Sequence, residues 1–232
     1  EESQFFIGKS NYKESPAYQL DQDYTNRAIE SFQLFLDIYP NSDKREEVNN
    51  LVDELTARLE KKAYLQAKLY YKTSDYKSAS VALNNVLSDF PDTDHHEEIN
   101  YLIADAKYLL AQKSIESKKI KRFKDAVSSA AYFNKKYAES DYNKDVAKIS
   151  KQSKSEIKRL KLDLPEFYSE KGNFDEAIDI YVTLIRHERS EEKKNELILR
   201  LFQVHHKKAR SVSTEKRLRA YEDLIEFLEE QK

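Results

Sequence analysis

Histidine and carboxylate side chains gather at one point of the sequence, residues 92–98. The segment supplies residue types that bind divalent metals such as Zn²⁺, namely Asp92, Asp94, His95, His96, Glu97 and Glu98. It also suits the first turn of a helix, where carboxylates lie near the positive end of the helix dipole. We favour the helix start, so the sequence predicts neither a bound metal nor a cofactor.

A second histidine pair, His205 and His206, is followed by Lys207 and Lys208. Cationic side chains are favourable near the negative end of a helix dipole, so this group is expected late in a helix. No partner ligands accompany it at the spacing of a metal site. The chain also lacks a glycine-rich phosphate loop, a nucleophile elbow and a His-Glu-x-x-His motif, so no enzymatic activity is predicted.

Basic residues are concentrated at Lys118, Lys119, Lys121 and Arg122. Such a group either binds phosphates or an acidic partner, or forms a solvated face. We expect it in the turn before a helix that begins at Arg122, and treat it as a candidate partner-binding site. The net charge is −2 and no aromatic platform accompanies the group, so nucleic acid is not an expected partner.

The composition indicates that helices position all of these residues. Only two glycines and four prolines occur in 232 residues, too few for the turns of a β-sandwich or barrel. Charged residues make up 35% and hydrophobic residues 39%, which suits amphipathic helices with one buried stripe. No segment approaches the roughly 18 consecutive apolar residues of a membrane-spanning helix. Methionine is absent, so we expect an additional segment upstream of Glu1.

A repeated string, aromatic-Pro-x-Ser/Thr-Asp, organises the chain. It occurs at residues 39–43 and 90–94 and, without the proline, at 137–141. Each copy follows apolar residues at helical spacing, and proline cannot continue the hydrogen-bond ladder of a helix. The string therefore predicts that one helix ends at the proline and that Asp43 or Asp94 caps the next.

Anchored on this string, the chain divides into tetratricopeptide units, each with a helix A, a tight turn and a helix B. Aromatic residues open helix B at Tyr24, Tyr76, Phe123 and Phe174. They lie about 50 residues apart rather than the usual 34 or so, which predicts extended A helices. The predicted fold is an all-α, right-handed α-solenoid of tetratricopeptide repeats. Residues 1–160 are expected to form units one to three. Residues 161–232 are expected to form a fourth unit and capping helices, with a break at 211–213.

The concave face of such a solenoid is an extended binding surface, and helix A lines it. The expected groove residues are Phe5, Phe6, Lys9 and Tyr12 in unit one and Tyr64, Leu65, Lys68 and Tyr71 in unit two. An apolar groove with lysines at its rim suits an extended peptide or its terminal carboxylate. Ordinary core packing is the alternative for part of this set. The tetratricopeptide carboxylate clamp needs lysine where Phe5 stands and asparagine where Lys9 stands, so that clamp is not predicted.

Several strings in residues 2–160 carry a family resemblance. They are residues 6–9 with Tyr12, the inserted Leu-Asp-Gln-x-Tyr-Thr string within residues 20–28, and residues 35–42, 59–63, 67–71, 90–93, 111–119 and 122–123. Together they resemble the BamD family, the tetratricopeptide lipoproteins of the outer-membrane β-barrel assembly machinery, and are most similar to its Bacteroidetes branch. Beyond Leu162 only the tetratricopeptide turn at residues 172–177 is recognisable.

This resemblance implies a lipoprotein on the periplasmic face of a Gram-negative outer membrane, anchored through a cysteine upstream of Glu1. It implies that the C-terminal half binds the POTRA repeats of a BamA-like barrel, with accessory subunits. The N-terminal half would recognise unfolded outer-membrane proteins. The predicted function is thus a non-enzymatic scaffold. Another tetratricopeptide adaptor of the cell envelope is the first alternative, and an enzyme or metal protein that uses residues 92–98 is the second.

Overall fold

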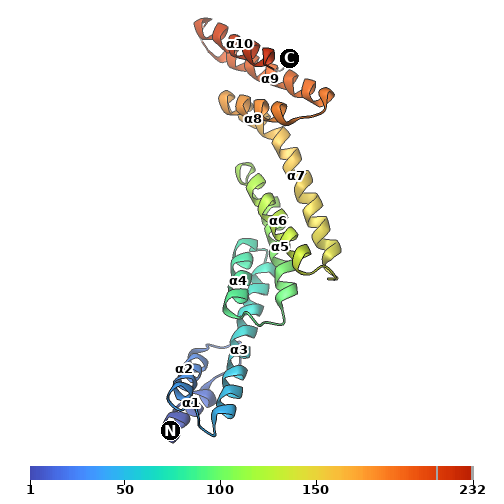
Figure 1. Ribbon diagram of the computed structural model, residues 1–232. Helices are drawn as coiled ribbons and strands as arrows, with labels where there is room; N and C mark the ends of the chain where they lie inside the picture. Colours follow the sequence, from blue (N-terminus) through green and yellow to red (C-terminus); the bar gives the residue numbers. More distant parts are fainter. Residues whose placement is uncertain (213, 231–232) are drawn as a thin grey trace. The chain divides into compact units, whose positions relative to one another are not determined.

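The computed structural model describes residues 1–212 and 214–230, and these ranges contain ten α-helices and no strand (Figure 1). The predicted all-α fold is confirmed. The helices are α1 (Glu2–Glu14), α2 (Asp23–Ile38), α3 (Arg45–Lys72), α4 (Tyr76–Asp89), α5 (His96–Gln112), α6 (Glu116–Lys136), α7 (Asn143–Glu170), α8 (Phe174–His187), α9 (Glu191–Ser211) and α10 (Thr214–Glu229). Both α3 and α7 have 28 residues, as expected for extended A helices, whereas α5 has only 17.

The chain forms two compact units. Unit 1 comprises residues 1–113 and 125–150, and unit 2 comprises residues 114–124 and the chain from residue 151 onward. Within unit 1, α1 packs on α2, α2 on α3, α3 on α4 and α4 on α5. Within unit 2, α8 packs on α9 and α9 on α10. Contacts between successive helices are typical of tetratricopeptide stacks.

Small side chains allow the paired helices to approach closely. Gly8 of α1 is buried against Phe32 of α2, and a Cβ atom at Gly8 would lie 2.4 Å from the Phe32 ring. Ala28, Ala79 and Ala177 open the B helices of their units and are completely buried. The tetratricopeptide preference for small residues at these positions is therefore a packing requirement.

The repeated aromatic-Pro-x-Ser/Thr-Asp string forms the turn between two units, but its hydroxyl residue makes the key contact. The hydroxyl oxygens of Ser42, Thr93 and Ser140 each accept a hydrogen bond from the backbone N–H two residues later, at 3.0–3.2 Å. Helices α3 and α5 begin two positions after Asp43 and Asp94 and have no side-chain cap. The prediction that these aspartates cap the helices is wrong, because the hydroxyl residue already holds the turn.

The proline of this string is not needed to end the preceding helix. Helix α2 ends at Ile38 and helix α4 ends at Asp89. In both cases an aromatic residue comes next and the proline follows it. Helix α6 ends in the same way before Tyr137, where Ala138 replaces the proline. The string thus separates two helices, as predicted, but the turn ends the preceding helix even where the proline is absent.

The basic group lies inside α6 rather than in the turn before it. The turn occupies residues 113–115 and α6 begins at Glu116, so the predicted helix start at Arg122 is wrong. The Glu116 carboxylate accepts from the Lys119 ammonium at 2.5 Å, and the Arg122 guanidinium donates to the Ser114 hydroxyl. These contacts offset the unfavourable position of cations near the positive end of a helix dipole.

The last three helices enclose a core of their own. Its buried members are Ala177, Tyr181 and Ile185 from α8, Leu197, Leu201 and Val204 from α9, and Leu224 and Phe227 from α10. Helix α7 continues through Pro165, whose missing N–H removes one bond of the helical ladder. The expected break at residues 211–213 falls between α9 and α10, and Ser213 itself lies outside the described residues.

Candidate protein-binding face

The residues expected in a peptide groove have different environments. Phe5 is buried in the core formed by α1, α2 and α3. Tyr64 is buried in the next core along the chain, which α3, α4 and α5 form. Phe6 and Leu65 remain exposed. The expected set therefore contains both packing residues and surface residues.

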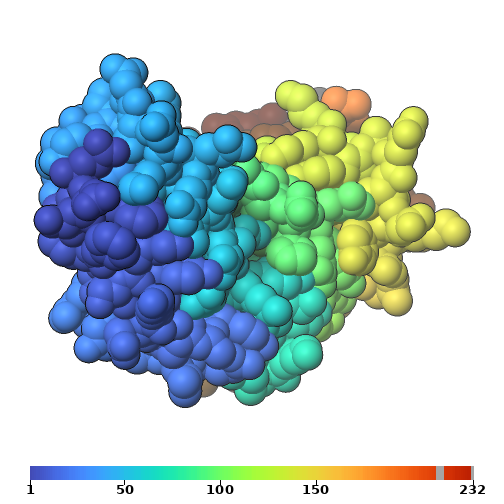
Figure 2. All heavy atoms as spheres, turned by 90° about the horizontal axis from the view of Figure 1, so that it is seen from below, coloured from blue at the N-terminus to red at the C-terminus, as the bar shows by residue number. Residues whose placement is uncertain are grey.

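In the first tetratricopeptide unit, the polar residues of the expected groove join α1 to α3. The Lys9 ammonium forms an ion pair with Glu47 at 2.7 Å and lies 5.6 Å from the centre of the Phe5 ring. The Tyr12 hydroxyl donates to the Glu54 carboxylate at 2.8 Å, and this hydrogen bond is the main reason that the pKa of Tyr12 is raised. Figure 2 shows α1 and α2, in dark blue, against the lighter blue start of α3.

In the second tetratricopeptide unit, which lies within unit 1, the equivalent residues join α3 to α5. The Lys68 ammonium donates to Glu98 at 2.7 Å and to the Tyr64 hydroxyl at 3.0 Å, and Tyr64 donates to the same carboxylate. The Tyr71 hydroxyl donates to the carboxylate of Asp105. Burial raises the pKa of Tyr71, and the bond to Asp105 raises it further. Both lysines of the expected groove thus bind carboxylates of the following A helix.

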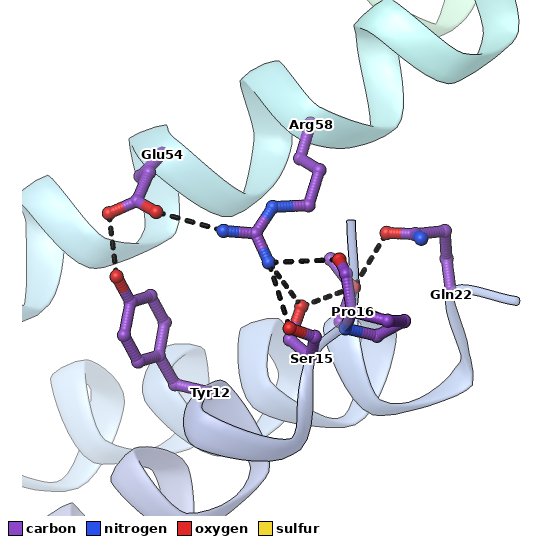
Figure 3. Close-up of polar contacts among 7 residues, drawn as sticks. Tyr12, Ser15, Pro16, Gln22, Glu54 and Arg58 are labelled. Atoms are coloured by element: carbon purple, nitrogen blue, oxygen red, sulfur yellow. Dashed lines mark hydrogen bonds and ion pairs between the residues drawn. The ribbon is translucent and has the colours of Figure 1, made fainter. Parts of the chain in front are cut away.

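The insertion between α1 and α2, residues 15–22, is joined to α3 by hydrogen bonds (Figure 3). The Arg58 guanidinium donates to the Ser15 hydroxyl at 2.7 Å and to the carbonyl oxygens of Ser15 and Pro16 at 3.2 Å each. Its other terminal nitrogen donates to Glu54 at 2.9 Å. Because Glu54 also accepts from Tyr12, one carboxylate links α1, the insertion and α3.

Buried polar side chains also form hydrogen bonds within this insertion. The Gln22 amide is buried and donates to the carbonyl oxygens of Ala17 and Leu20 at 3.0 Å each. Its amide oxygen accepts from the Thr25 hydroxyl at 2.7 Å, and Thr25 also lies 2.6 Å from the Ser15 hydroxyl. Residues 15–22 are therefore an ordered part of the surface.

The ordered insertion brings an apolar residue beside α3. The Lys62 ammonium donates to the Leu20 carbonyl at 2.6 Å, and the Leu20 side chain is 61% exposed. Leu65 and Leu69 follow Lys62 at helical spacing on α3 and are also exposed. We call Leu20, Leu65 and Leu69 the apolar strip. Sequence reasoning selected Leu65 alone, although Leu20 lay within the inserted string and Leu69 is one turn beyond Leu65.

Among the histidine and carboxylate residues at 92–98, His95, His96 and Glu98 each contact a different group. The His95 ring stacks on Tyr64 with centroids 4.0 Å apart, and His96 Nε2 donates to the Pro91 carbonyl at 2.5 Å. Glu98 is committed to Lys68. Within residues 1–212 and 214–230, no three His, Asp or Glu side chains are grouped as a metal site.

The second histidine pair belongs to α9 and contacts α10. His205 is buried, and its Nδ1 donates to the Ala220 carbonyl at 2.9 Å. Burial lowers the pKa of His205, so its role as a helix-end cation is not supported. His206 Nδ1 lies 2.8 Å from the Tyr221 hydroxyl. The pair packs the two helices together.

Comparison with known protein families decides the broader identity. Residues 56–219, more than two thirds of the chain, match the family model YfiO, described as an outer membrane lipoprotein. The chain belongs to the YfiO family of outer membrane lipoproteins. This membership supports the BamD-type resemblance. No individual curated protein matches the chain.

The YfiO match overlaps the sequence motifs from residue 59 onward and extends beyond them toward the C-terminus. The match includes Leu65 and Leu69 of the apolar strip and nearly all of unit 2, where few motifs were recognisable. Residues 1–55, with the insertion and Leu20, lie outside it. In the part of the chain that the structure describes, no helix is both long and apolar enough to cross a membrane.

Proposed function

We propose that this YfiO-family chain is a non-enzymatic scaffold of outer-membrane β-barrel assembly. It would bind the POTRA repeats of a BamA-like barrel and accessory subunits, and it would receive unfolded outer-membrane proteins. Family membership over residues 56–219 carries the proposal, and the stacked helical hairpins supply a suitable framework. We place the protein on the periplasmic face, with a lipid anchor upstream of Glu1, and in the Bacteroidetes-like branch that the sequence motifs together resemble.

The apolar strip is our proposed contact for unfolded substrates. Exposed apolar side chains that lie together on an ordered surface are typical of protein-binding sites. Leu20, Leu65 and Leu69 offer such a surface, and Phe6 adds an exposed aromatic residue on α1. Lys9, Tyr12, Lys68 and Tyr71 of the expected groove would act indirectly, by fixing the spacing of the A helices through their carboxylate partners. Phe5 and Tyr64 would contribute as packing residues.

The basic residues of α6 remain a candidate partner surface. The side chains of Lys118 and Lys121 are exposed, whereas Lys119 and Arg122 are engaged with Glu116 and Ser114. We propose that Lys118 and Lys121 contact acidic groups of the barrel or of an accessory subunit.

The decisive test is co-purification. An affinity-tagged chain, expressed with its own upstream segment, is recovered from detergent-solubilised outer membranes. The expected result is a stoichiometric BamA-like barrel in the eluate. Recovery of the tagged chain without such a barrel would overturn the assembly function and favour another adaptor of the cell envelope.

The apolar strip is tested by photo-crosslinking to an unfolded barrel protein in urea-diluted solution. Leu20→Glu combined with Leu65→Glu should lower the crosslinked yield about tenfold, because two contact residues become charged. Val81→Glu is the matched control, since Val81 is an exposed aliphatic residue of α4 outside the strip. Equal yields for the strip variant and the control would remove the strip from the proposal.

A further inference from the structure

A pocket of about 290 Å³ lies in unit 2 among α7, α8 and α9. Its floor is formed by three leucines, Leu162, Leu184 and Leu197, one from each helix. Leu197 is a buried member of the core of unit 2, and the other two pack against that core. The pocket therefore exposes the edge of a hydrophobic core to solvent.

Cationic side chains dominate the rim of this pocket. Lys158 and Lys161 come from α7, and Lys193 and Arg200 come from α9. Arg200 is engaged by Glu196 at 2.8 Å. The three lysine ammonium groups form no ion pair with any carboxylate in residues 1–212 and 214–230. Their charge is available to a ligand.

The remaining carboxylate of the rim has a local structural role. Glu188 follows the end of α8, and its carboxylate accepts from the backbone N–H groups of Arg189 at 2.9 Å and Ser190 at 3.0 Å. The bond from Ser190 is the main cause of the lowered pKa of Glu188, with smaller contributions from Lys193 and Lys158. Glu188 thus remains anionic and holds the turn before α9.

The size and chemistry of the pocket favour a side chain over a whole small molecule. Small-molecule sites usually have about 300–1,000 Å³ and a few polar groups that fix the ligand within an apolar wall. This pocket lies at the lower limit, and its leucine floor offers no polar group. An apolar anchor residue in a pocket, surrounded by polar contacts at the edge, is the usual arrangement of a protein-docking site.

We propose that the pocket docks an acidic segment of a partner protein. One large aliphatic or aromatic side chain inserts between Leu162, Leu184 and Leu197, and flanking carboxylates meet Lys158, Lys161 and Lys193. Charge complementarity selects this occupant, because the rim has four cations and both of its carboxylates already have partners. The inference rests on the scaffold function proposed above and adds a second docking point in a different unit from the apolar strip.

The test uses fluorescence anisotropy with the full chain and a fluorescein-labelled peptide that has one leucine flanked by glutamates. A second peptide replaces the leucine with serine. The protein variant combines Lys158→Glu with Lys161→Glu, both exposed residues. Lys207→Glu is the control for a charge reversal elsewhere in unit 2, since Lys207 is exposed on α9 and does not line the pocket. Circular dichroism verifies that each variant is folded.

The expected result is saturable binding of the leucine peptide, weakened about tenfold or more by the serine substitution and by the double variant. Lys207→Glu should remain within about twofold of the unaltered chain. Absence of binding to the unaltered chain, equal binding of the serine peptide, or equal effects of the double variant and the control would overturn the proposal. Recovery of a BamA-like barrel is a separate readout: if it succeeds while peptide binding fails, only the pocket assignment falls.

Discussion

The Arg58 guanidinium donates to the Ser15 hydroxyl at 2.7 Å and so joins α3 to the insertion between α1 and α2. The same guanidinium reaches two carbonyl oxygens of the insertion and the Glu54 carboxylate. A planar group with several donors in a fixed geometry can make all of these contacts at once, which lysine cannot. Leu20 owes its position beside α3 to this arrangement and to Lys62.

Replacing Arg58 with alanine should therefore loosen the insertion. Charge-assisted hydrogen bonds contribute about 1.5–3 kcal/mol, so we expect the free energy of unfolding of unit 1 to fall by about 2 kcal/mol. Hydrogen exchange at residues 15–22 should accelerate as well. Urea unfolding and exchange measurements check both effects. Arg27→Ala is the control. Arg27 forms an ion pair with Asp23 in which both side chains are exposed, and such a pair contributes little to stability. Equal effects of the two substitutions would contradict the role of Arg58.

Two turns between helices A and B place a residue in the left-handed region of φ. Ser74 has φ 64° in the turn from α3 to α4, and Gly172 has φ 80° in the turn from α7 to α8. A side chain there costs roughly 1 kcal/mol, whereas glycine adopts this conformation freely. Ser74→Gly should therefore stabilise unit 1 by about 0.5–1 kcal/mol, and Gly172→Ser should destabilise unit 2 by a similar amount.

Thermal unfolding of both variants checks this pair of opposite effects. A Cβ atom at Gly172 would meet no atom within 4 Å, so backbone strain alone would act there. Ser78→Gly, in the first turn of α4, is the control and should destabilise by roughly 0.5 kcal/mol. A destabilised Ser74→Gly variant would show that the turn tolerates serine without strain.

The sequence was sufficient for the helices and insufficient for side-chain partners. Helical spacing and the repeated string predicted the helix order and the extended α3, because both depend on local patterns. The hydrogen bond that the Thr93 hydroxyl accepts in the turn was missed because an aspartate follows it and resembles a helix cap. The α6 start was misplaced by six residues, because the cations there are compensated by Glu116 and Ser114.

The candidate site depended even more on contacts that are distant in sequence. Lys68 resembles a rim cation until its partner Glu98, thirty residues later, is known. Leu20 becomes part of a surface only when the insertion folds back on α3. No periodicity reports such contacts, since they follow from how successive units pack.

His205 should make the stability of unit 2 depend on pH. Burial is the main cause of its lowered pKa; Lys208 lowers it further, whereas the Ala220 carbonyl, Asp223 and Asp175 raise it. The unfolded chain therefore binds a proton more readily than the folded one, and stability is lost as the pH falls through the unfolded pKa of 6.5. The slope contributed by this group can reach about 1.4 kcal/mol for each pH unit.

Denaturant unfolding between pH 7.5 and 5.5 measures this dependence. His205→Gln should flatten the curve, because glutamine can still donate to the Ala220 carbonyl but does not titrate. His206→Gln is the control, since His206 is exposed. If the His205 variant keeps the full pH dependence, another group is responsible.

Tyr71 and Asp105 test whether the contacts between A helices stabilise unit 1. Burial raises the pKa of Asp105, and the hydrogen bond from Tyr71 opposes that rise. Tyr71→Phe removes the hydrogen-bond donor and leaves a largely buried carboxylate without it, so we expect the free energy of unfolding to fall by about 1–3 kcal/mol at pH 7.

The folded pKa of Asp105 lies above its unfolded value, so the folded state takes up the proton first as the pH falls. The cost of Tyr71→Phe should then shrink between pH 7 and pH 4.5, because the neutral carboxyl needs the donor less. Tyr101→Phe is the control, since Tyr101 is a half-buried tyrosine of α5 that stacks on Tyr142 and donates no hydrogen bond to Asp105. A pH-independent cost equal to that of the control would show that the Tyr71 hydroxyl does not support the carboxylate.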